Sequence, residues 1–347
     1  MSDPIDIELK NKLRVIEGSK IPDLKLSAFD SDEILKVLSE NSAELMSDWY
    51  KFQEIWKANA YVAFKDYDTY LVLIYLVQQS WQDYAKRFIF FSKIEIYNKD
   101  VIIEKINLID ISLELGIPKE TIRRKINELQ ERKIIKRKGK KIILSLFTEN
   151  IQNPIKSLET FTHFLSKFSF FLSKNDWFGG HESKESIVSF TNKHFTVCWS
   201  NFLKLQINSM IRSKKAFGDL ESWHIWGVIL LNHSHYLKKS INSNVLNDNK
   251  TTQRNYYFTL IRQKINYGVN ASSISDVSNI PRATVIRKLA KLKKKKLLKR
   301  NKTSEYLLDA EGKMNKKIKS DNDILFKEIA IFVTSFFNLM KKSNLKV

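Results

Sequence analysis

Lysine, arginine and threonine side chains recur at matching positions in two short segments of the chain. Residues 117–126 read IPKETIRRKI and residues 280–289 read IPRATVIRKL, an offset of 163 positions (280 − 117). Clustered ammonium and guanidinium groups attract phosphates, and a planar guanidinium donates two parallel hydrogen bonds to the edge of a guanine. These residue types at this spacing therefore favour non-covalent recognition of double-stranded DNA.

Each basic segment is preceded by the pattern of a short helix and a turn. In the first copy we expect one helix over residues 109–115 and a second over residues 118–132. Gly116 lies between them and suits a turn that needs a positive φ, and Asn279, the next best choice, has the equivalent place in the second copy. The proline that opens each second helix is tolerated there, because its missing N–H would have no partner. The sequence thus predicts a helix-turn-helix unit twice.

The second helix of each unit combines an apolar stripe with a basic face. The residues expected to face the core are Ile122, Ile126 and Leu129, with the counterparts Val285, Leu289 and Leu292. The opposite face is the one that a recognition helix presents to the major groove. The candidate DNA-contacting residues on this face are Lys119, Thr121, Arg123, Arg124, Lys125 and Asn127 in the first copy and Arg282, Thr284, Ile286, Arg287, Lys288 and Lys291 in the second.

An apolar residue interrupts the second basic face. Ile286 is branched and lies among cations, where solvation gives no reason for it. Contact with thymine methyl groups is one explanation, and a wider core-facing stripe is the other. The sequence leaves both open.

A β-like pair with a basic tip follows each second helix, over residues 134–144 and 297–308. Such a hairpin can lie along phosphates or enter the minor groove. Its candidate DNA contacts are Lys138, Lys140 and Lys141 in the first copy and Lys302 in the second. A single lysine of this kind is most often only a solvated surface charge. The prediction therefore depends on the whole pattern of helix, turn, basic helix and hairpin, which occurs twice.

Each half of the chain resembles a winged helix-turn-helix domain of the MarR type. The similarity is clearest over residues 258–317, where residues 310–313 (AEGK) follow the hairpin as the family's post-wing turn does; the Asp-x-Arg element usual in the family's wing is absent from both copies. The resemblance implies a mainly α fold with small β wings, built as two tandem winged helix-turn-helix modules. MarR-type proteins are usually homodimers whose terminal helices form the interface, and a cleft between this interface and the DNA-binding lobe can hold a small ligand.

The duplication extends over nearly the whole chain. Residues 64–66 parallel residues 217–219 at an offset of 153 (219 − 66), and Phe164 parallels Phe332 at an offset of 168 (332 − 164). The extra residues of the second copy are expected in the polar segment 242–254, as a surface loop.

Two modules follow from this repeat, residues 1–175 and residues 176–347, each with a winged helix and its flanking helices. We expect them to form a single-chain pseudo-dimer with a rough two-fold axis. Residues 155–174 and 322–342 should pack near this axis. Such a chain is self-sufficient for DNA binding as a monomer.

The positive charge of the chain is concentrated in the repeated units. The formal net charge is +21, which favours a polyanionic partner, either nucleic acid or an anionic membrane surface. Part of this excess reflects a composition rich in Lys, Ile and Asn. Residues 105–141 contain twelve Lys and Arg against five Asp and Glu, and residues 262–302 contain thirteen against Asp276 alone. This distribution favours DNA.

Other kinds of site have weaker support. Cys198 is the single cysteine, so a disulfide framework is excluded within the chain and a buried structural thiol is favoured. His233 and His235 do not share a helical face, which disfavours a metal site with His224. No phosphate-binding loop, paired-carboxylate site or nucleophile motif occurs. We therefore expect that the protein is not an enzyme and needs no metal or cofactor.

Tryptophans recur at helical spacing, which favours core or interface packing over the wall of an effector pocket. They are Trp49, Trp56, Trp199, Trp223 and Trp226. The longest apolar runs, residues 70–77 and 225–231, are far short of the ~20 residues that a membrane span needs. The start of the chain, MSDPID, is acidic and unlike a signal peptide. We expect no membrane partner and a cytoplasmic, nucleoid-associated protein.

Together these features predict a sequence-specific double-stranded DNA-binding transcriptional regulator with two recognition helices in one chain. A plasmid-type replication initiator or a nucleoid or architectural DNA-binding protein stays open as the alternative. A winged-helix module that binds protein is disfavoured by the basic faces. A small-molecule effector also stays open, with its identity unknown.

Overall fold

The computed structural model describes residues 29–103, 107–138, 141–145, 155–243, 256–262, 265 and 267–344. These residues form many helices, a three-stranded antiparallel sheet and a two-stranded antiparallel sheet. The predicted fold class, mainly α with small β elements, is confirmed at this level. Lys140, most of the predicted loop 242–254 and the first six residues lie outside the described residues.

The first half of the chain is built around two long helices. α3 (Ser42–Phe64) is followed by α4 (Tyr67–Lys86), which begins where the Asp66 carboxylate accepts a hydrogen bond from the Thr69 backbone N–H. The other elements of this half are α2 (Ser31–Glu40), α5 (Lys93–Tyr97), β1 (Asp100–Ile103), α6 (Leu108–Leu115), α7 (Lys119–Glu131), β2 (Ile135–Lys138), β3 (Lys141–Ser145) and α8 (Ile155–Leu172).

The second half repeats this order of elements, except that, among the described residues, an isolated bridge between Val269 and Tyr306 replaces the strand β1. α10 (Phe195–Phe217) and α11 (Leu220–Asn242) correspond to α3 and α4 at an offset of 153 (195 − 42), and Asp219 caps α11 as Asp66 caps α4. The other elements are α9 (Lys184–Lys193), α13 (Tyr256–Arg262), α14 (Ala271–Ser278), α15 (Arg282–Lys294), β4 (Leu298–Arg300), β5 (Tyr306–Leu308) and α16 (Met314–Asn344). The repeat in the sequence is thus also a repeat of secondary structure.

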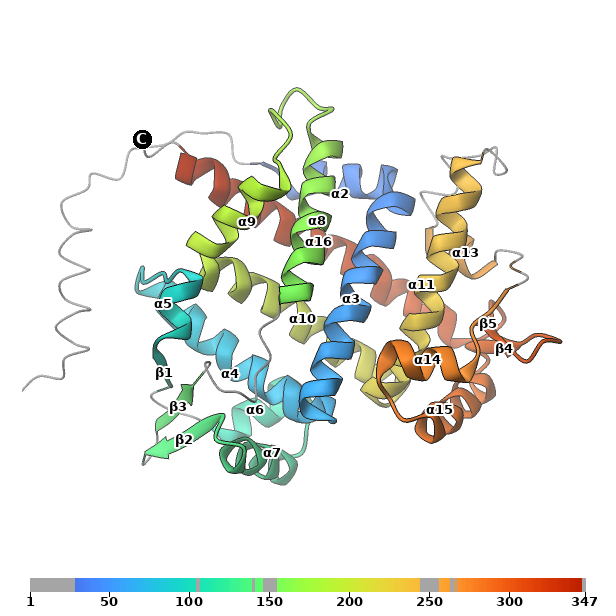
Figure 1. The fold of residues 1–347 in the computed structure, drawn as a ribbon, viewed down its shortest axis with the longest axis horizontal. Helices are drawn as coiled ribbons and strands as arrows, with labels where there is room; N and C mark the ends of the chain where they lie inside the picture. The colour runs from blue at the N-terminus through green and yellow to red at the C-terminus, as the bar shows by residue number, and fades with distance from the viewer. Residues whose placement is uncertain are drawn as a thin grey trace, which may run out of the picture.

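The two halves share one continuous hydrophobic core. α3 packs against α11 of the other half, and α4 packs against α10. In the same way, α2 packs against α16 and α8 packs against α9. These contacts come in pairs that are exchanged when the halves are exchanged. In Figure 1 the long helices cross the middle of the molecule, and α7 and α15 lie at its lower edge on opposite sides.

The helices that end each half meet at the centre of the molecule. The Phe161 ring on α8 lies 5.7 Å from the Phe332 ring on α16, between centroids. This contact brings residues 155–174 and 322–342 together, and the two-fold axis near which they are expected to pack with the N-terminal helices stays a prediction. The pairs Trp49–Phe164 and Phe202–Phe332, 5.2 and 6.2 Å apart, are equivalent under the two sequence offsets. Aromatic packing therefore follows the repeat into the core.

The hairpins β2–β3 and β4–β5 follow α7 and α15 in the chain, and β1, which precedes α6, completes the first sheet. In the first sheet β3 lies between β1 and β2, and Ile135 of β2 pairs with Leu144 of β3. Both residues are buried, while Lys136 and Lys138 on β2 are exposed. In the second sheet Leu298 pairs with Leu308, and both are again buried. Packing of the apolar residues thus leaves basic side chains of each hairpin at the surface.

Candidate nucleic-acid interface

The turn inside each helix-turn-helix unit has the conformation that the sequence predicts. Gly116 has φ = 62° and Asn279 has φ = 59°, both in the left-handed region. Each residue ends the first helix of its unit, α6 or α14, and each is followed by a buried isoleucine and a proline. Glycine and then asparagine tolerate this region best, which is why these residue types mark the turn. The predicted turn is confirmed in both copies.

α7 and α15 bury the predicted apolar stripe. All six of its residues, Ile122, Ile126, Leu129, Val285, Leu289 and Leu292, are at most 1 % exposed. Each such side chain contributes roughly 1.5–3 kcal/mol when fully buried, which fixes the rotation of both helices about their axes. The opposite face is therefore turned to solvent.

The exposed face carries most of the predicted contact residues. Those on α7 are Lys119, Arg123, Arg124 and Asn127, with Thr121 half-buried, and those on α15 are Arg282, Ile286, Arg287 and Lys291, with Thr284 half-buried. Ile286 is 43 % exposed, so the alternative of a wider core-facing stripe is wrong. A contact of Ile286 with thymine methyl groups stays a prediction.

Two of the predicted contact residues point into the protein instead. Lys125 Nζ lies 2.9 Å from Asp66 Oδ2 and 3.0 Å from Glu128 Oε2. Lys288 Nζ lies 2.8 Å from Asp219 Oδ1. Their side chains are 10 % and 15 % exposed, so the prediction that Lys125 and Lys288 lie on the groove-facing side is wrong. Both sit on the flank of their helix that meets α4 or α11, where a carboxylate draws the ammonium group inward.

These two lysines fasten each basic helix to the long helix that it packs against. Asp66 and Asp219 already cap α4 and α11. Each carboxylate therefore joins the N-terminus of a long helix to a lysine of the basic helix in the same half, Lys125 on α7 or Lys288 on α15. Burial alone would raise the pKa of Asp66, but hydrogen bonds from Thr69 and Lys125 lower it below its ordinary value. Burial is likewise outweighed at Asp219, where Lys288 and other donors lower the pKa. Both carboxylates are ionised at neutral pH.

Lys291 combines both situations. Its Nζ lies 2.7 Å from Asp219 Oδ2, yet its side chain is 44 % exposed. An ion pair this exposed is weak and can be exchanged for another anion. Lys291 therefore keeps its place on the basic face, in contrast to Lys288.

The hairpins place further cations beside the two helices. Lys138 and Lys141 are exposed and pair in register at the ends of β2 and β3, and Lys302 is exposed in the turn between β4 and β5. The fourth predicted hairpin contact, Lys140, lies outside the described residues. Exposed cations in and beside these elements that were not predicted are Lys133, Lys136, Arg137, Lys293, Lys294, Lys296, Lys299 and Arg300. The unbroken run of four lysines at 293–296 is the signal that would have added three of them.

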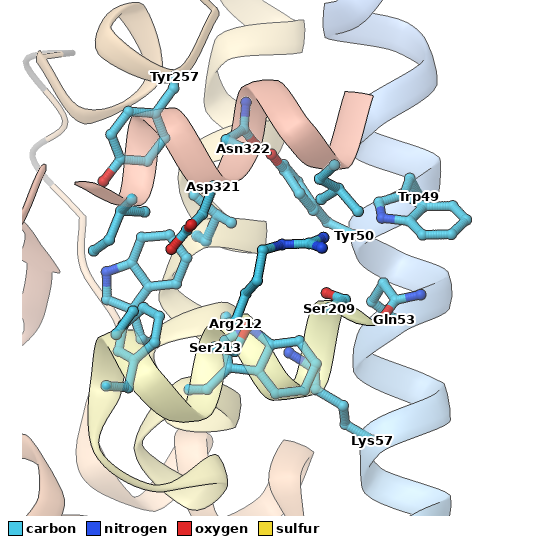
Figure 2. Close-up of a pocket in the computed structure, with 18 of the residues that line it drawn as sticks. Trp49, Tyr50, Gln53, Lys57, Ser209, Arg212, Ser213, Tyr257, Asp321 and Asn322 are labelled. Carbon is cyan, nitrogen blue, oxygen red and sulfur yellow. Dashed lines mark hydrogen bonds between the residues drawn. The ribbon is translucent and has the colours of Figure 1, made fainter. Parts of the chain in front are cut away.

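A cavity lies where α3 of the first half meets α10, α11, α13 and α16 of the second (Figure 2). It holds about 690 Å³ of empty space, part of it open to solvent. Trp49, Trp223 and Trp226 line it, whereas Trp56 and Trp199 pack on other aromatic rings in the core. The sequence favours core packing for all five tryptophans. Three of them also form part of the cavity wall.

The polar groups of the cavity are unevenly paired. In Figure 2, Arg212 extends from α10 into the cavity between Asp321 and Tyr50. Arg212 donates two hydrogen bonds to the Glu328 carboxylate, one of 2.7 Å between Nη1 and Oε1. Asp321 makes no ion pair with any other described residue, and burial raises its pKa. Gln53 is 6 % exposed, and its Nε2 has no hydrogen-bond partner among the described residues.

A buried set of charged and polar groups forms the wall between the cavity and the core. Glu54 and Lys57 form an ion pair with side chains at most 5 % exposed, and His224 Nε2 lies 3.3 Å from Glu54 Oε2. The other ring nitrogen of His224, Nδ1, is 2.5 Å from the Tyr67 hydroxyl. Burial lowers the pKa of Lys57, and burial also lowers the pKa of His224. Sequence analysis missed this set; a Glu and a Lys three positions apart in an aromatic-rich helix are its signal.

The close approach of α3 to α11 at this place requires a glycine. A Cβ added at Gly227 would overlap Glu54 Oε1 and Lys57 Nζ. The helix α11 therefore accommodates the ion pair only because residue 227 has no side chain.

The remaining candidate sites have structural partners. His233 lies between the Leu260 carbonyl and the Leu308 backbone N–H, at 3.2 and 3.1 Å. Within the described ranges, no group of three or more His, Cys, Asp or Glu side chains is placed to hold a metal ion. Cys198 is buried, as the sequence favours. Over the same ranges, no helix combines the length and the apolar character needed to cross a membrane.

Comparison of the chain with family models, with curated proteins and with solved structures finds no match.

Proposed function

We propose that this protein binds double-stranded DNA sequence-specifically and regulates transcription, as two tandem winged helix-turn-helix modules of the MarR type in one chain. The observation that carries this proposal is the paired placement of α7 and α15. Both lie at one edge of the molecule, on opposite sides (Figure 1), and both turn a basic face to solvent. Each is also held by the same lysine–aspartate contact to a long helix.

In this proposal α7 and α15 enter successive major grooves, which lie roughly 34 Å apart on one side of a duplex. Arg124 and Arg287, which are equivalent and exposed, read base edges. Hairpin lysines such as Lys138 and Lys302 hold phosphates. Because α3 packs against α11 and α4 against α10, the spacing of the two helices is set within a single chain.

The proposed protein acts by binding and not by catalysis. Its net charge of +21 supports strong attraction to DNA, and the proposal includes association with the nucleoid. Two other DNA-binding functions share the same surface, namely a replication initiator and an architectural protein. A module that binds protein uses the fold differently and gains nothing from two basic helices at one edge.

The test is selection of bound duplexes from a random pool by the full chain, near physiological salt. We expect a motif with two related but unequal half-sites, about one helical turn apart. Tight binding with no enriched motif would support the architectural protein. An enriched motif whose matches in the genome lie at a replication origin would support the initiator. A chain that retains no DNA even at low salt would overturn the proposal and leave protein binding.

A matched pair of variants connects that motif to the structure. Arg124→Ala and Arg287→Ala should each weaken binding to the selected site by roughly 1–3 kcal/mol. Lys86→Ala is the control, since this lysine is exposed but lies at the far end of α4, paired with Asp83. If neither arginine variant differs from the control, α7 and α15 are not the reading helices.

We also propose a second function for the cavity, the binding of a small aromatic cation as an effector. Two of its cations, Lys57 and Arg212, already have carboxylate partners. Asp321 makes no ion pair with a described residue, although the charges of Arg212 and Lys317 act on it. Lys57 already lies over the Trp223 ring, so Trp49 and Trp226 are the rings that, beside this carboxylate, favour a positively charged group. The unpartnered Gln53 amide adds a hydrogen-bond donor for an acceptor on the ligand.

The cavity is tested by thermal unfolding of the full chain with matched aromatic amines and aromatic carboxylates. We expect the amines alone to raise the melting temperature, since a ligand at a hundred times its Kd stabilises by about 2.7 kcal/mol. Asp321→Asn should remove the effect, and Asp323→Asn, which changes a more exposed carboxylate nearby, should keep it. A response to the carboxylates, or an equal response of both variants, would contradict the proposed ligand class.

A further inference from the structure

The two helix-turn-helix units have the same fold but different charge. Residues 107–138 contain nine Lys and Arg against five Asp and Glu, a net charge of +4. The equivalent residues 270–301 contain ten Lys and Arg against one Asp, a net charge of +9. The largest contributions come from the equivalent pairs Glu120/Ala283, Glu128/Lys291, Gln130/Lys293 and Glu131/Lys294. All four lie on α7 or α15.

The arginines of α7 have carboxylate partners on the same helix. Arg123 Nη1 lies 2.8 Å from Glu120 Oε2, and Arg124 Nε lies 3.9 Å from Glu128 Oε1. Both arginines and Glu120 are exposed and Glu128 is half-buried, so these arginine–glutamate pairs are weak and can be exchanged for other contacts. An arginine that contacts DNA must nevertheless leave its glutamate, and the glutamates repel nearby phosphates.

The cations of α15 have no such partners. The helix contains no acidic residue, and Arg287, Lys293 and Lys294 are exposed and make no ion pair with other described residues. The ion pairs of this helix are made by Lys288 and Lys291 with Asp219 on the inner side. Arg287, Lys293 and Lys294 on its outer face can therefore bind phosphates without the loss of an existing ion pair, whereas Lys291 would have to leave Asp219.

We infer that the two units act unequally on DNA, and the inference rests on the proposed DNA binding. α15 supplies most of the attraction to the phosphates and binds duplexes of any sequence. α7 engages where its half-site offers base edges that replace Glu120 and Glu128 as partners of Arg123 and Arg124. Such a division is open to a duplicated chain but closed to a homodimer, whose two recognition helices are identical.

Charge exchange between the units tests this inference. Lys293→Gln with Lys294→Glu changes the charge of α15 by −3, and Lys136→Gln with Arg137→Glu is the matched change of −3 in the first unit. Gln130→Lys with Glu131→Lys raises the charge of α7 by +3. Combined with the α15 pair, it keeps the net charge of the chain at +21. All of these positions are exposed, so the fold should be kept, which unfolding curves check.

The measurement is the affinity of each full-length variant for a duplex of random sequence over a series of salt concentrations. Each phosphate contact contributes about 0.9 to the slope of log K against log salt. We expect the α15 pair to reduce this slope by about 2 and the matched pair in the first unit by less than half as much. The exchange variant should recover the slope, because α7 then carries the lysines.

Failure of the inference and failure of the proposed function give different results. Equal slope changes for the two −3 variants, with wild-type binding intact, would overturn the unequal roles and leave the proposed function. A wild-type chain that binds no duplex at low salt would overturn both. An exchange variant that binds as weakly as the α15 pair alone would overturn the explanation of the unequal roles by the charge of the two helices, because α7 then carries the same charges without binding phosphates.

Discussion

The contact of α3 with α11 and the contact of α10 with α4 are equivalent in the repeat, yet their interiors differ. In the first, Glu54, Lys57 and His224 are buried. The residues at the same places in the second, at an offset of 153, are Ile207, Met210 and Leu71. All six are at most 6 % exposed. The same helix-packing position can thus bury either charged or apolar side chains.

This difference is informative because a buried ion pair is not an efficient way to stabilise a core. Desolvation of two charges offsets much of their attraction, and apolar residues of similar volume often do as well or better. The apolar set at the α10–α4 contact demonstrates that such a core fits this fold. Glu54 and Lys57 of the ionic set line the cavity, whereas Ile207, Met210 and Leu71 do not. We attribute the charged set to the cavity and not to stability.

The largest expected effect comes from breaking the ionic set on one side only. Lys57→Met leaves Glu54 buried without its cation and should destabilise the fold by about 3–5 kcal/mol. Glu54→Ile with Lys57→Met and His224→Leu copies the three residues of the other half and should restore stability to near the wild-type value. Urea unfolding of both variants is the measurement, with Met210→Leu as the control for a change of shape alone. A triple variant as unstable as the single one would show that the two interiors are not interchangeable.

The two halves also differ at one buried position of the long helices: α11 has the titratable His233 where α4, at an offset of 153, has Ser80. His233 Nε2 accepts a hydrogen bond from the Leu308 N–H, and burial lowers its pKa to about 4. The folded state therefore binds this proton less readily than the unfolded chain, whose histidine pKa is about 6.5. Stability is complete above about pH 6.5 and falls as the pH drops toward 4, by roughly 3 kcal/mol in total.

Unfolding free energies measured over this pH range check the effect. His224, whose pKa is also lowered by burial, acts in the same direction. His233→Gln should flatten the pH dependence, whereas His163→Gln, at an exposed position, should leave it unchanged. Identical pH profiles for the wild type and His233→Gln would rule out His233 as the source.

Local patterns explain which parts of the fold and site the sequence could predict. Gly116 and Asn279 predict turns because few residue types adopt a positive φ. Ile122 and Val285 predict a buried stripe because apolar residues recur at helical spacing. These signals lie within one element. The turns, the buried stripes, the hairpins and the duplication were therefore predictable from the sequence, whereas the third strand of the first sheet, β1, was not predicted.

What the sequence could not supply depends on contacts between distant elements. Lys125 turns inward because Asp66, fifty-nine positions earlier (125 − 66), lies beside it in the fold. A helical wheel of α7 alone does not contain this carboxylate. In the same way, the cavity exists because α3 crosses to the second half, so no single stretch of sequence encodes it.

A smaller effect is expected from the glycine that admits the ion pair. Gly227 corresponds to Ile74 in the apolar contact, at an offset of 153. Gly227→Ala places a Cβ against Glu54 and Lys57 and should destabilise by roughly 1–3 kcal/mol, the usual range for overpacking. Gly180→Ala is the control, because a Cβ there meets nothing within 4 Å. Equal thermal stability of the two variants would show that the ion pair moves aside without cost.

The smallest expected effect concerns the comparison of α7 with α15 at the proposed DNA-binding surface. Glu120 and Ala283 are equivalent, and Glu120 alone has an arginine partner. An exposed pair of this kind is worth about 0.2–1 kcal/mol, so Glu120→Gln should raise DNA affinity by up to about five-fold as Arg123 is released. Ala283→Glu should lower affinity by a similar factor, because it places a carboxylate near the phosphates and near Arg287. Fluorescence anisotropy at one fixed salt concentration measures both. Opposite signs would establish that carboxylates on these helices oppose binding, whereas two changes of the same sign would mean that Glu120 contacts the DNA itself.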